Sequence, residues 1–169
     1  AVPHLRAWVE GQQGESAPLL HFATLLADLG AHDEAAVLLD RALNLEPESA
    51  ALHRRRGDLA RKRGEKRLAA DHYRAALTAE PEDPETRFKY GSVLASLGDP
   101  EGAIAALERA LEDDADLAEA RYELGLLYYT ERGDAERALA QLDEALRLAP
   151  ENATAKMIRQ EILLERERG

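Results

Sequence analysis

Cysteine is absent from this sequence of 169 residues, which excludes a disulfide framework, Cys-ligated zinc, an iron–sulfur cluster and a cysteine nucleophile. Basic residues are scarce, because 22 Lys and Arg stand against 33 Asp and Glu and leave a formal charge of −11. Such a surface repels phosphate backbones, so we expect no nucleic-acid partner. The longest apolar runs, such as residues 124–129, are far too short to cross a bilayer, and we expect a soluble protein without membrane insertion.

Signals for β-strands are missing as well. Val, Ile and Thr are sparse, and no long run alternates apolar and polar residues. Ala, Leu, Glu and Arg dominate a composition of 45% hydrophobic and 33% charged residues, which is typical of amphipathic helices packed on one another. We therefore predict an all-α protein. The many Ala and Arg residues and the few Lys residues suggest a GC-rich bacterial source. The compartment, cytoplasm or periplasm, stays open.

A period of 34 residues organises most of the chain. Small residues recur at this interval in several columns: Ala23, Gly57, Gly91 and Gly125; Ala35, Ala69 and Ala103; Ala42, Ala76 and Ala110; and Gly30, Gly64 and Gly98. In the fourth unit the later columns fall one residue further on, at Gly133, Ala138 and Ala145, so one residue has entered the turn before them. The predicted units are residues 16–49, 50–83, 84–117 and 118–152.

The sequence pattern within each unit predicts two helices joined by a tight turn. In the third unit a helix from about Pro84 to Leu97 is closed by Gly98, because glycine adopts the left-handed conformation without steric cost. Asp99 then caps the second helix, and Pro100 occupies its first turn, where a missing N–H does no harm. Gly133 and Asp134 are expected to serve the fourth unit in the same way. A single hairpin cannot bury its apolar faces, but stacked copies can.

This pattern resembles the tetratricopeptide repeat family. The fourth unit supplies the features of the family's motif: Gly125 with Tyr128 three residues later, small Ala138 and Ala145 on the second helix, and a closing Pro150. The agreement covers residues 16–150, or 135 of 169 residues. The resemblance implies a right-handed α-solenoid of stacked helix-turn-helix hairpins that binds protein or peptide partners in a concave groove.

Two positions depart from the family's pattern. The column that often holds Trp early in the first helix contains Leu19, His53, Arg87 and Arg121. Arg56 occupies a column that elsewhere holds the core-type residues Phe22, Tyr90 and Leu124. Either the first helix of the second unit packs less well, or Arg56 extends its stem past the core to a carboxylate.

The two ends of the chain lie outside the four units. Asn152 is predicted to cap a last helix that runs to about Arg166 within residues 153–169 and caps the stack. Its apolar side is predicted to contain Met157, Ile158, Ile162 and Leu163. Residues 1–15 are either the remnant of a preceding repeat or an N-terminal cap packed through Trp8.

Catalytic and cofactor motifs are missing. The histidines at positions 4, 21, 32, 53 and 72 show neither one-turn pairing nor a shared position in the repeat, so we interpret each as a surface or packing residue. No phosphate loop, nucleophile elbow or dinucleotide fingerprint is present. We predict no catalytic residue, metal or cofactor, and therefore a non-enzymatic protein.

Candidate binding residues lie on the first helices, on the faces expected to line the groove. They are Arg54, Asp58 and Arg61 in the second unit, Phe88, Lys89 and Ser92 in the third, and Tyr122, Leu126 and Tyr129 in the fourth. Five of the eight aromatic residues lie between Phe88 and Tyr129, and rigid aromatic surface is typical of binding sites. Arg54, Arg61 and Lys89 would add donors for a carboxylate. The alternative is that the aromatic rings pack against neighbouring helices and bind nothing.

Charge suggests a second surface. Residues 53–67 contain eight Lys and Arg against Asp58 and Glu65, which gives +6 within a protein of −11. This stretch could dock an acidic partner, pair protomers through the acidic run 112–114, or form a solvated face. Three functions remain open: an adaptor that captures a protein segment, a self-assembling or spacing repeat that forms homo-oligomers, and an accessory domain of a larger bacterial enzyme or envelope-assembly protein.

Overall fold

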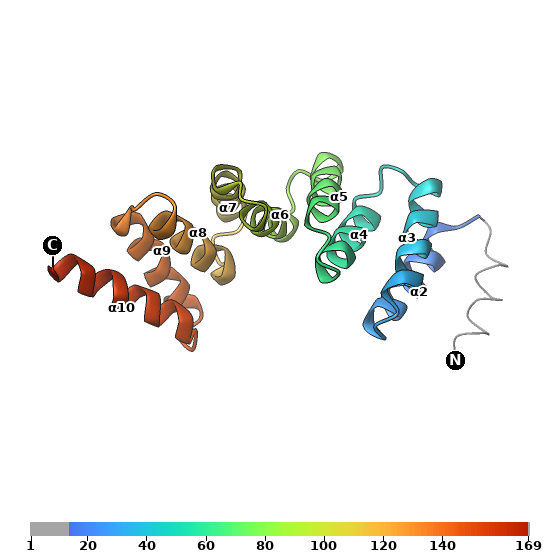
Figure 1. The fold of residues 1–169 in the computed structure, drawn as a ribbon. Helices are drawn as coiled ribbons and strands as arrows, with labels where there is room; N and C mark the ends of the chain where they lie inside the picture. The colour runs from blue at the N-terminus through green and yellow to red at the C-terminus, as the bar shows by residue number, and fades with distance from the viewer. Residues whose placement is uncertain (1–13, 169) are drawn as a thin grey trace. The chain divides into compact units, whose positions relative to one another are not determined.

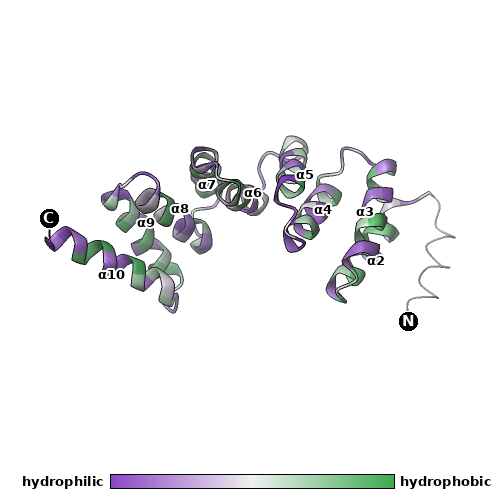
Figure 2. Cartoon of the chain, viewed as in Figure 1, coloured by the Kyte–Doolittle hydropathy of each residue, from purple (hydrophilic) through white to green (hydrophobic). Residues whose placement is uncertain are grey.

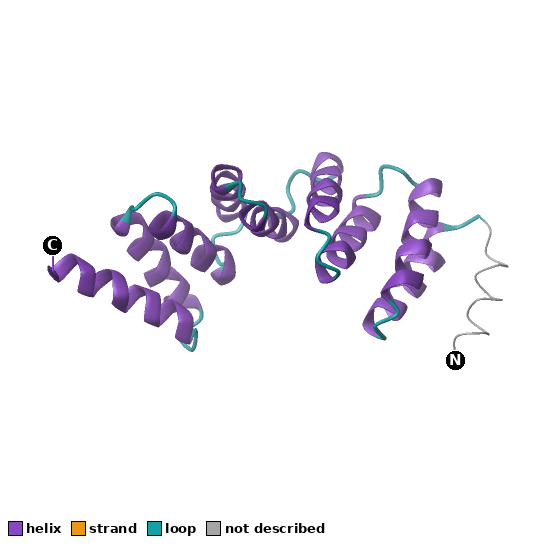
Figure 3. Cartoon of the chain, in the orientation of Figure 1, coloured by secondary structure: helices purple, strands orange, loops and turns teal. Residues whose placement is uncertain are grey.

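The structure, a computed structural model, describes residues 14–168. Over this range helices alternate with short loops, and no strand forms (Figure 3). The helices are α2 (Ser16–Asp28), α3 (His32–Leu45), α4 (Ala50–Lys62), α5 (Lys66–Ala79), α6 (Pro84–Ser96), α7 (Pro100–Asp113), α8 (Ala118–Thr130), α9 (Ala135–Leu148) and α10 (Ala153–Arg168) (Figure 1). Helices α2 to α9 form four hairpins of two consecutive helices each, and α10 packs on α9 and α8.

The turns inside the hairpins confirm the prediction made for the third and fourth units. Gly98 and Gly133 have φ of 80° and 61°, a left-handed conformation that strains any residue with a Cβ. Asp99 accepts a hydrogen bond from the Gly102 amide at 3.0 Å, so it caps α7. Asp134 caps α9 by accepting from the Arg137 amide at 3.0 Å.

In three of the four hairpins, a glycine on the first helix meets a large residue on the second. A Cβ added to Gly57 would lie 2.7 Å from the ring of Tyr73. A Cβ on Gly125 would lie 3.0 Å from Leu142 Cγ. Because real Cβ contacts are rarely this short, glycine lets the two helices approach closely enough to bury the large side chain completely.

The chain divides into two compact units, unit 1 (Ala1–Pro81) and unit 2 (Glu82–Gly169), and each has its own core. Helices in both units carry apolar and polar residues on different sides (Figure 2). The buried cluster of unit 1 comprises Leu19, Ala23, Leu26, Ala35, Ala36, Leu39, Ala42, Leu52 and Leu59. The buried cluster of unit 2 comprises Ala103, Ile104, Leu107, Ala120, Leu124, Leu127, Tyr128, Ala138, Leu139, Leu142, Ala155, Ile158 and Ile162.

Arg56 is buried in unit 1, with 8% of its surface exposed. Its Nε donates to Asp40 Oδ1 at 2.7 Å, and its Nη1 lies 3.9 Å from Glu65 Oε2. Of the two predicted explanations, the extended stem is therefore the one observed. The aliphatic part of the side chain fills a core position while the guanidinium keeps carboxylate partners, which offsets the desolvation of the charge.

Helix α10 differs from its prediction in one respect. Asn152 caps it as predicted, since Asn152 Oδ1 accepts from the Ala155 amide at 3.0 Å, and the helix extends to Arg168. Ile158 and Ile162 are buried and Leu163 is half-buried, but Met157 is 64% exposed. The assignment of Met157 to the packed side is therefore wrong.

Two further predictions concern an N-terminal cap packed through Trp8 and the absence of a membrane-spanning helix. Trp8 and the proposed N-terminal cap lie outside the described residues. Between residues 14 and 168, no helix combines the length and the apolar character that a bilayer span needs.

Candidate peptide-binding surface

The aromatic candidates of unit 2 lie on the first helices of its hairpins. Phe88 projects from α6, and Tyr122, Leu126 and Tyr129 project from α8. All four are partly buried and pack against the unit 2 core, so part of each side chain remains accessible. Both interpretations of these residues thus have a physical basis: the rings contribute to packing, and they also present a rigid apolar surface.

Polar contacts join α6 to α8 and α8 to α10 in unit 2. Ser92 Oγ on α6 donates to the carboxylate of Glu123 on α8 at 2.6 Å. Tyr129 Oη on α8 donates to Glu165 Oε2 on α10 at 2.8 Å, and this bond to a carboxylate raises the pKa of Tyr129 to about 12. These contacts hold the exposed faces of α6, α8 and α10 next to one another. The remaining candidate, Lys89, pairs with Glu85 one turn earlier at 2.9 Å.

The candidates of unit 1 make contacts within their own unit. Arg54 forms an ion pair with Glu80. Asp58 accepts a hydrogen bond from Tyr73 Oη at 2.8 Å, and burial together with this carboxylate raises the pKa of Tyr73 above its usual range. Arg61 is exposed and lies near the same hydroxyl. The nine candidates therefore divide between the two units, with three in unit 1 and six in unit 2.

Nearby carboxylates balance part of the basic stretch of unit 1. Besides the pairs of Arg54 and Arg56, Arg63 Nη1 lies 2.8 Å from Asp33 and its Nε lies 2.9 Å from Glu65. These pairs favour the interpretation of this stretch as a solvated face, because cations with local partners offer less to an acidic ligand.

Sequence reasoning missed a histidine pair in unit 1. His53 on α4 and His72 on α5 approach with their Nδ1 atoms 3.0 Å apart, and His53 Nε2 lies 2.9 Å from the Pro47 carbonyl oxygen. If His53 donates from Nε2 to that carbonyl, its Nδ1 is the acceptor and His72 Nδ1 is the donor. The two histidines occupy different positions in the repeat, so no signal in the sequence indicates that they would meet. Neither ring joins a group of three potential metal ligands among residues 14–168.

The histidine pair predicts a pH-dependent stability of unit 1. Burial, Arg56 and His53 together lower the pKa of His72 from 6.5 to about 4, against weaker opposing effects of Asp40 and Asp71. Protonation thus favours the unfolded chain, so this contribution is complete above pH 6.5 and is lost as the pH falls toward 4. Allowing for the partial exposure of the ring, we expect a loss of about 1–2 kcal/mol.

The measurement is urea unfolding, followed by circular dichroism, at pH 7.5 and pH 5.0. The His72→Gln variant should lose less stability between these two conditions than the wild type, whereas His21→Gln, which changes an exposed histidine, should behave as the wild type does. Equal losses in wild type and His72→Gln would contradict the assignment.

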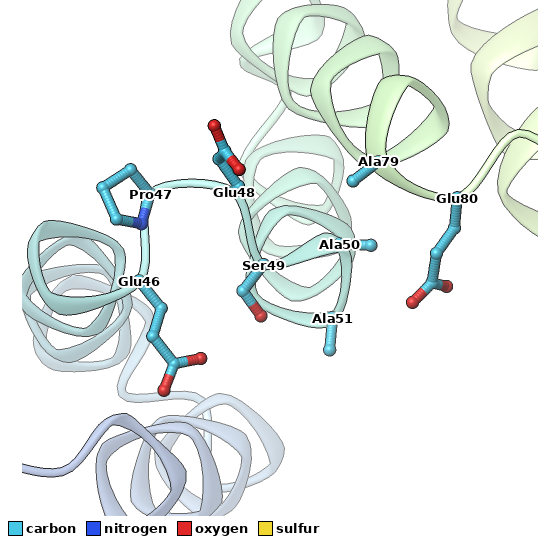
Figure 4. Close-up of a pocket in the computed structure, with 8 residues that line it drawn as sticks. All are labelled: Glu46, Pro47, Glu48, Ser49, Ala50, Ala51, Ala79 and Glu80. Atoms are coloured by element: carbon cyan, nitrogen blue, oxygen red, sulfur yellow. The ribbon is translucent and has the colours of Figure 1, made fainter.

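A hollow in unit 1 is a poor anchor for a peptide. It is lined by Glu46, Pro47, Glu48, Ser49, Ala50, Ala51, Ala79 and Glu80, which come from the α3–α4 connection, the start of α4 and the end of α5 (Figure 4). Glu46 already accepts a hydrogen bond from Ser16 Oγ, and Glu80 pairs with Arg54. Small and acidic side chains with internal partners provide neither an aromatic platform nor a strong donor set.

Comparison with known proteins agrees with this architecture. A family model described as Tetratricopeptide repeat matches residues 20–85 and 129–168, and one described as TPR repeat matches residues 91–130. The probable biofilm formation methyltransferase WspC of Pseudomonas putida is 36% identical over 105 residues, which are 62% of this chain and 24% of that protein. The chain thus spans about a quarter of the length of this relative.

Solved structures show the same fold. The crystal structure of YrrB, described as a TPR protein with an unusual peptide-binding site, matches with a TM-score of 0.84 and 25% identity over 99% of this chain and 86% of that chain. The crystal structure of MamA matches with a TM-score of 0.81 and 22% identity over 89% of this chain and 87% of that chain.

The fold class is therefore an all-α solenoid, a type that supports protein-interaction scaffolds. With family models matching across four hairpins, this chain belongs to the tetratricopeptide repeat family.

Proposed function

We propose that this protein is a non-enzymatic adaptor that binds a peptide segment of a partner protein across the first helices of unit 2. The observation that carries this proposal is the set of three partly exposed rings, Phe88, Tyr122 and Tyr129, on a packed scaffold. Rigid aromatic side chains lose little entropy on binding and are enriched among the residues that dominate interface energies. Leu126 adds an aliphatic surface between the two tyrosines on α8.

Two further points support the adaptor proposal. The YrrB structure carries a peptide-binding site on a closely similar fold, and the present chain covers most of that protein. Helices with hydrogen-bonded faces, as in the Ser92–Glu123 contact, are also preorganised, so a ligand would not have to order them first. Arg54, Asp58 and Arg61 belong to unit 1 and are not part of this proposed surface, and their present partners would compete with a ligand.

The test starts from a phage-displayed library of random dodecapeptides selected on the immobilised protein. Affinities of selected peptides are then measured by fluorescence anisotropy. The Phe88→Ala/Tyr122→Ala/Tyr129→Ala variant should bind at least about tenfold more weakly, because truncation removes the central apolar contacts.

The matched control is Tyr122→Phe/Tyr129→Phe, which keeps both rings and should change affinity by less than about threefold. Circular dichroism and thermal melting must show that each variant remains folded, since these rings also pack on the core. Undiminished binding by the alanine variant would refute the proposed surface.

A second candidate is a TPR segment that serves a longer protein. The observation favouring it is the 36% identity to a probable methyltransferase of which this chain matches only 24%. We propose that in such a context these hairpins recruit a partner while any methyl transfer is carried out by another segment. Determining the reading frame upstream of Ala1 tests this candidate. A methyltransferase segment there would support it, and the absence of such a segment would leave the adaptor as the only proposed function.

A further inference from the structure

Helix α10 continues the pattern of exposed positions found on α8. It begins 35 residues after α8, the same step as the longer fourth repeat, so Met157, Glu161 and Leu164 correspond to Tyr122, Leu126 and Tyr129. Met157 is 64% exposed and Leu164 is 40% exposed, whereas Ile158 and Ile162 bury the other side of the helix. Two large apolar side chains therefore face solvent in the same columns as the aromatic candidates.

The two helices are joined on this side. Besides the general packing of α10 on α8 and α9, the Tyr129 hydroxyl reaches Glu165 at 2.8 Å. This bond ties the end of α8 to the last turns of α10. The corresponding columns consequently form one surface, which we call the α8–α10 surface and define by Glu119, Tyr122, Leu126 and Tyr129 of α8 and Met157, Glu161, Leu164 and Glu165 of α10.

Charge indicates what this surface attracts. Unit 2 contains 11 Lys and Arg against 21 Asp and Glu, a balance of −10, whereas unit 1 has 11 against 12 and a balance of −1. Some unit 2 carboxylates have cationic partners: Asp113 with Arg87 and Arg109, Asp143 with Arg159, Glu144 with Arg147, and Glu101 with Arg132.

The carboxylates of the α8–α10 surface are among those without such a partner. Glu119, Glu161 and Glu165 have no Lys or Arg nitrogen within 4.0 Å among residues 14–168. An apolar strip is thus bordered by negative charges that the described residues leave without cations. Such a border disfavours acidic ligands and favours Lys or Arg, whose charge-assisted hydrogen bonds to carboxylates are stronger than neutral ones.

We propose that the α8–α10 surface binds a cationic amphipathic segment of a partner protein. Apolar side chains of this segment pack on Tyr122, Met157 and Leu164, while its Lys or Arg side chains pair with Glu161 and the neighbouring carboxylates. The inference rests on the proposed adaptor function and deepens it by naming the ligand chemistry and by adding α10 to the surface. The bound segment also brings cations to an acidic unit, which speeds association at low ionic strength.

The experiment uses three fluorescently labelled pools of dodecapeptides with the same Leu and Phe positions. Their other positions carry Lys and Arg, Ser and Gln, or Asp and Glu. With the full chain in 50 mM salt, anisotropy should detect binding of the cationic pool at least about tenfold tighter than the neutral pool, and raising the salt to about 300 mM should weaken it at least about fivefold.

Variants separate the apolar and the charged contributions. Met157→Ser/Leu164→Ser should weaken binding of the cationic pool about tenfold, whereas Leu97→Ser, which removes an apolar side chain of similar exposure to Leu164 elsewhere in unit 2, should not. Glu161→Gln/Glu165→Gln should weaken binding about tenfold and flatten its salt dependence. The charge-matched control Glu136→Gln/Glu151→Gln changes two exposed carboxylates outside this surface and should have little effect.

Each other outcome overturns the inference in a distinguishable way. Equal weakening by both glutamine variants would mean general attraction to an acidic protein. Tighter binding of the neutral or acidic pool, lost with the alanine substitutions at Phe88, Tyr122 and Tyr129, would refute the cationic ligand and retain the adaptor function. No binding of any pool, together with no selected peptides from the random library, would refute both.

Discussion

Replacing Tyr73 with alanine is expected to lower the free energy of unfolding of unit 1 by about 3–5 kcal/mol. The side chain is fully buried, and its ring fills the space directly opposite Gly57. Neighbouring helices α4 and α5 cannot close this space without shifting their backbones, so the substitution leaves a cavity. Urea unfolding by circular dichroism gives the magnitude, and hydrogen exchange locates the loss of protection in α4 and α5.

Tyr73→Phe is the matched control for this prediction. It keeps the ring and removes only the hydroxyl that donates to Asp58 at 2.8 Å. Because Asp58 is partly exposed and water can replace the lost donor, we expect a cost of about 1 kcal/mol. If the phenylalanine and alanine variants lost equal stability, the hydrogen bond and not the packing of the ring would be the dominant contribution.

The second large effect concerns the hairpin of α8 and α9. Leu142→Ala should cost about 2–5 kcal/mol, because Leu142 is fully buried. Gly125→Ala should cost about 1–3 kcal/mol despite the better helix propensity of alanine. The added Cβ would lie 3.0 Å from Leu142 Cγ and 3.2 Å from the Ala138 carbonyl oxygen. The carbonyl oxygen can move away only if the backbone of α9 shifts.

The double variant distinguishes direct contact from two independent defects. Removing the Leu142 side chain makes room for the added methyl group, so Gly125→Ala/Leu142→Ala should lose about 1 kcal/mol less than the sum of the single losses. Gly125→Ala/Leu107→Ala is the control, because Leu107 packs opposite Gly91 in the preceding hairpin and should be additive. Additive losses in both pairs would show that Gly125 and Leu142 do not share one space.

Much of the fold could be predicted because its determinants are local. Asp99 and Gly98 act within one turn of the chain, so their roles follow from neighbouring residues alone. The 34-residue period identified the hairpins, since three of the units repeat a contact between a glycine on the first helix and a large residue on the second. The candidate binding residues were predictable only as positions on a helix face, and their roles in binding remain a prediction.

Contacts between helices were not predictable in the same way. Arg54 pairs with Glu80, Ser92 donates a hydrogen bond to Glu123, and Tyr129 donates one to Glu165, across separations of 26 to 36 residues along the chain. No period in the sequence specifies these pairs, because each depends on which rotamers two packed helices allow. They matter for the proposals made above, since such contacts decide which charged groups already have a partner.

By itself, the sequence determined the all-α class, the repeat, the turns and the caps, because helix periodicity and backbone preference are properties of short segments. Only the tertiary structure decided that Arg56 reaches Asp40, that His53 meets His72, and that Met157 faces solvent. The physical reason is that burial and pairing depend on the neighbouring helix as well as on the residue itself. On α10, Ile158 and Ile162 are covered by the packed hairpin, and Met157 on the same helix is not.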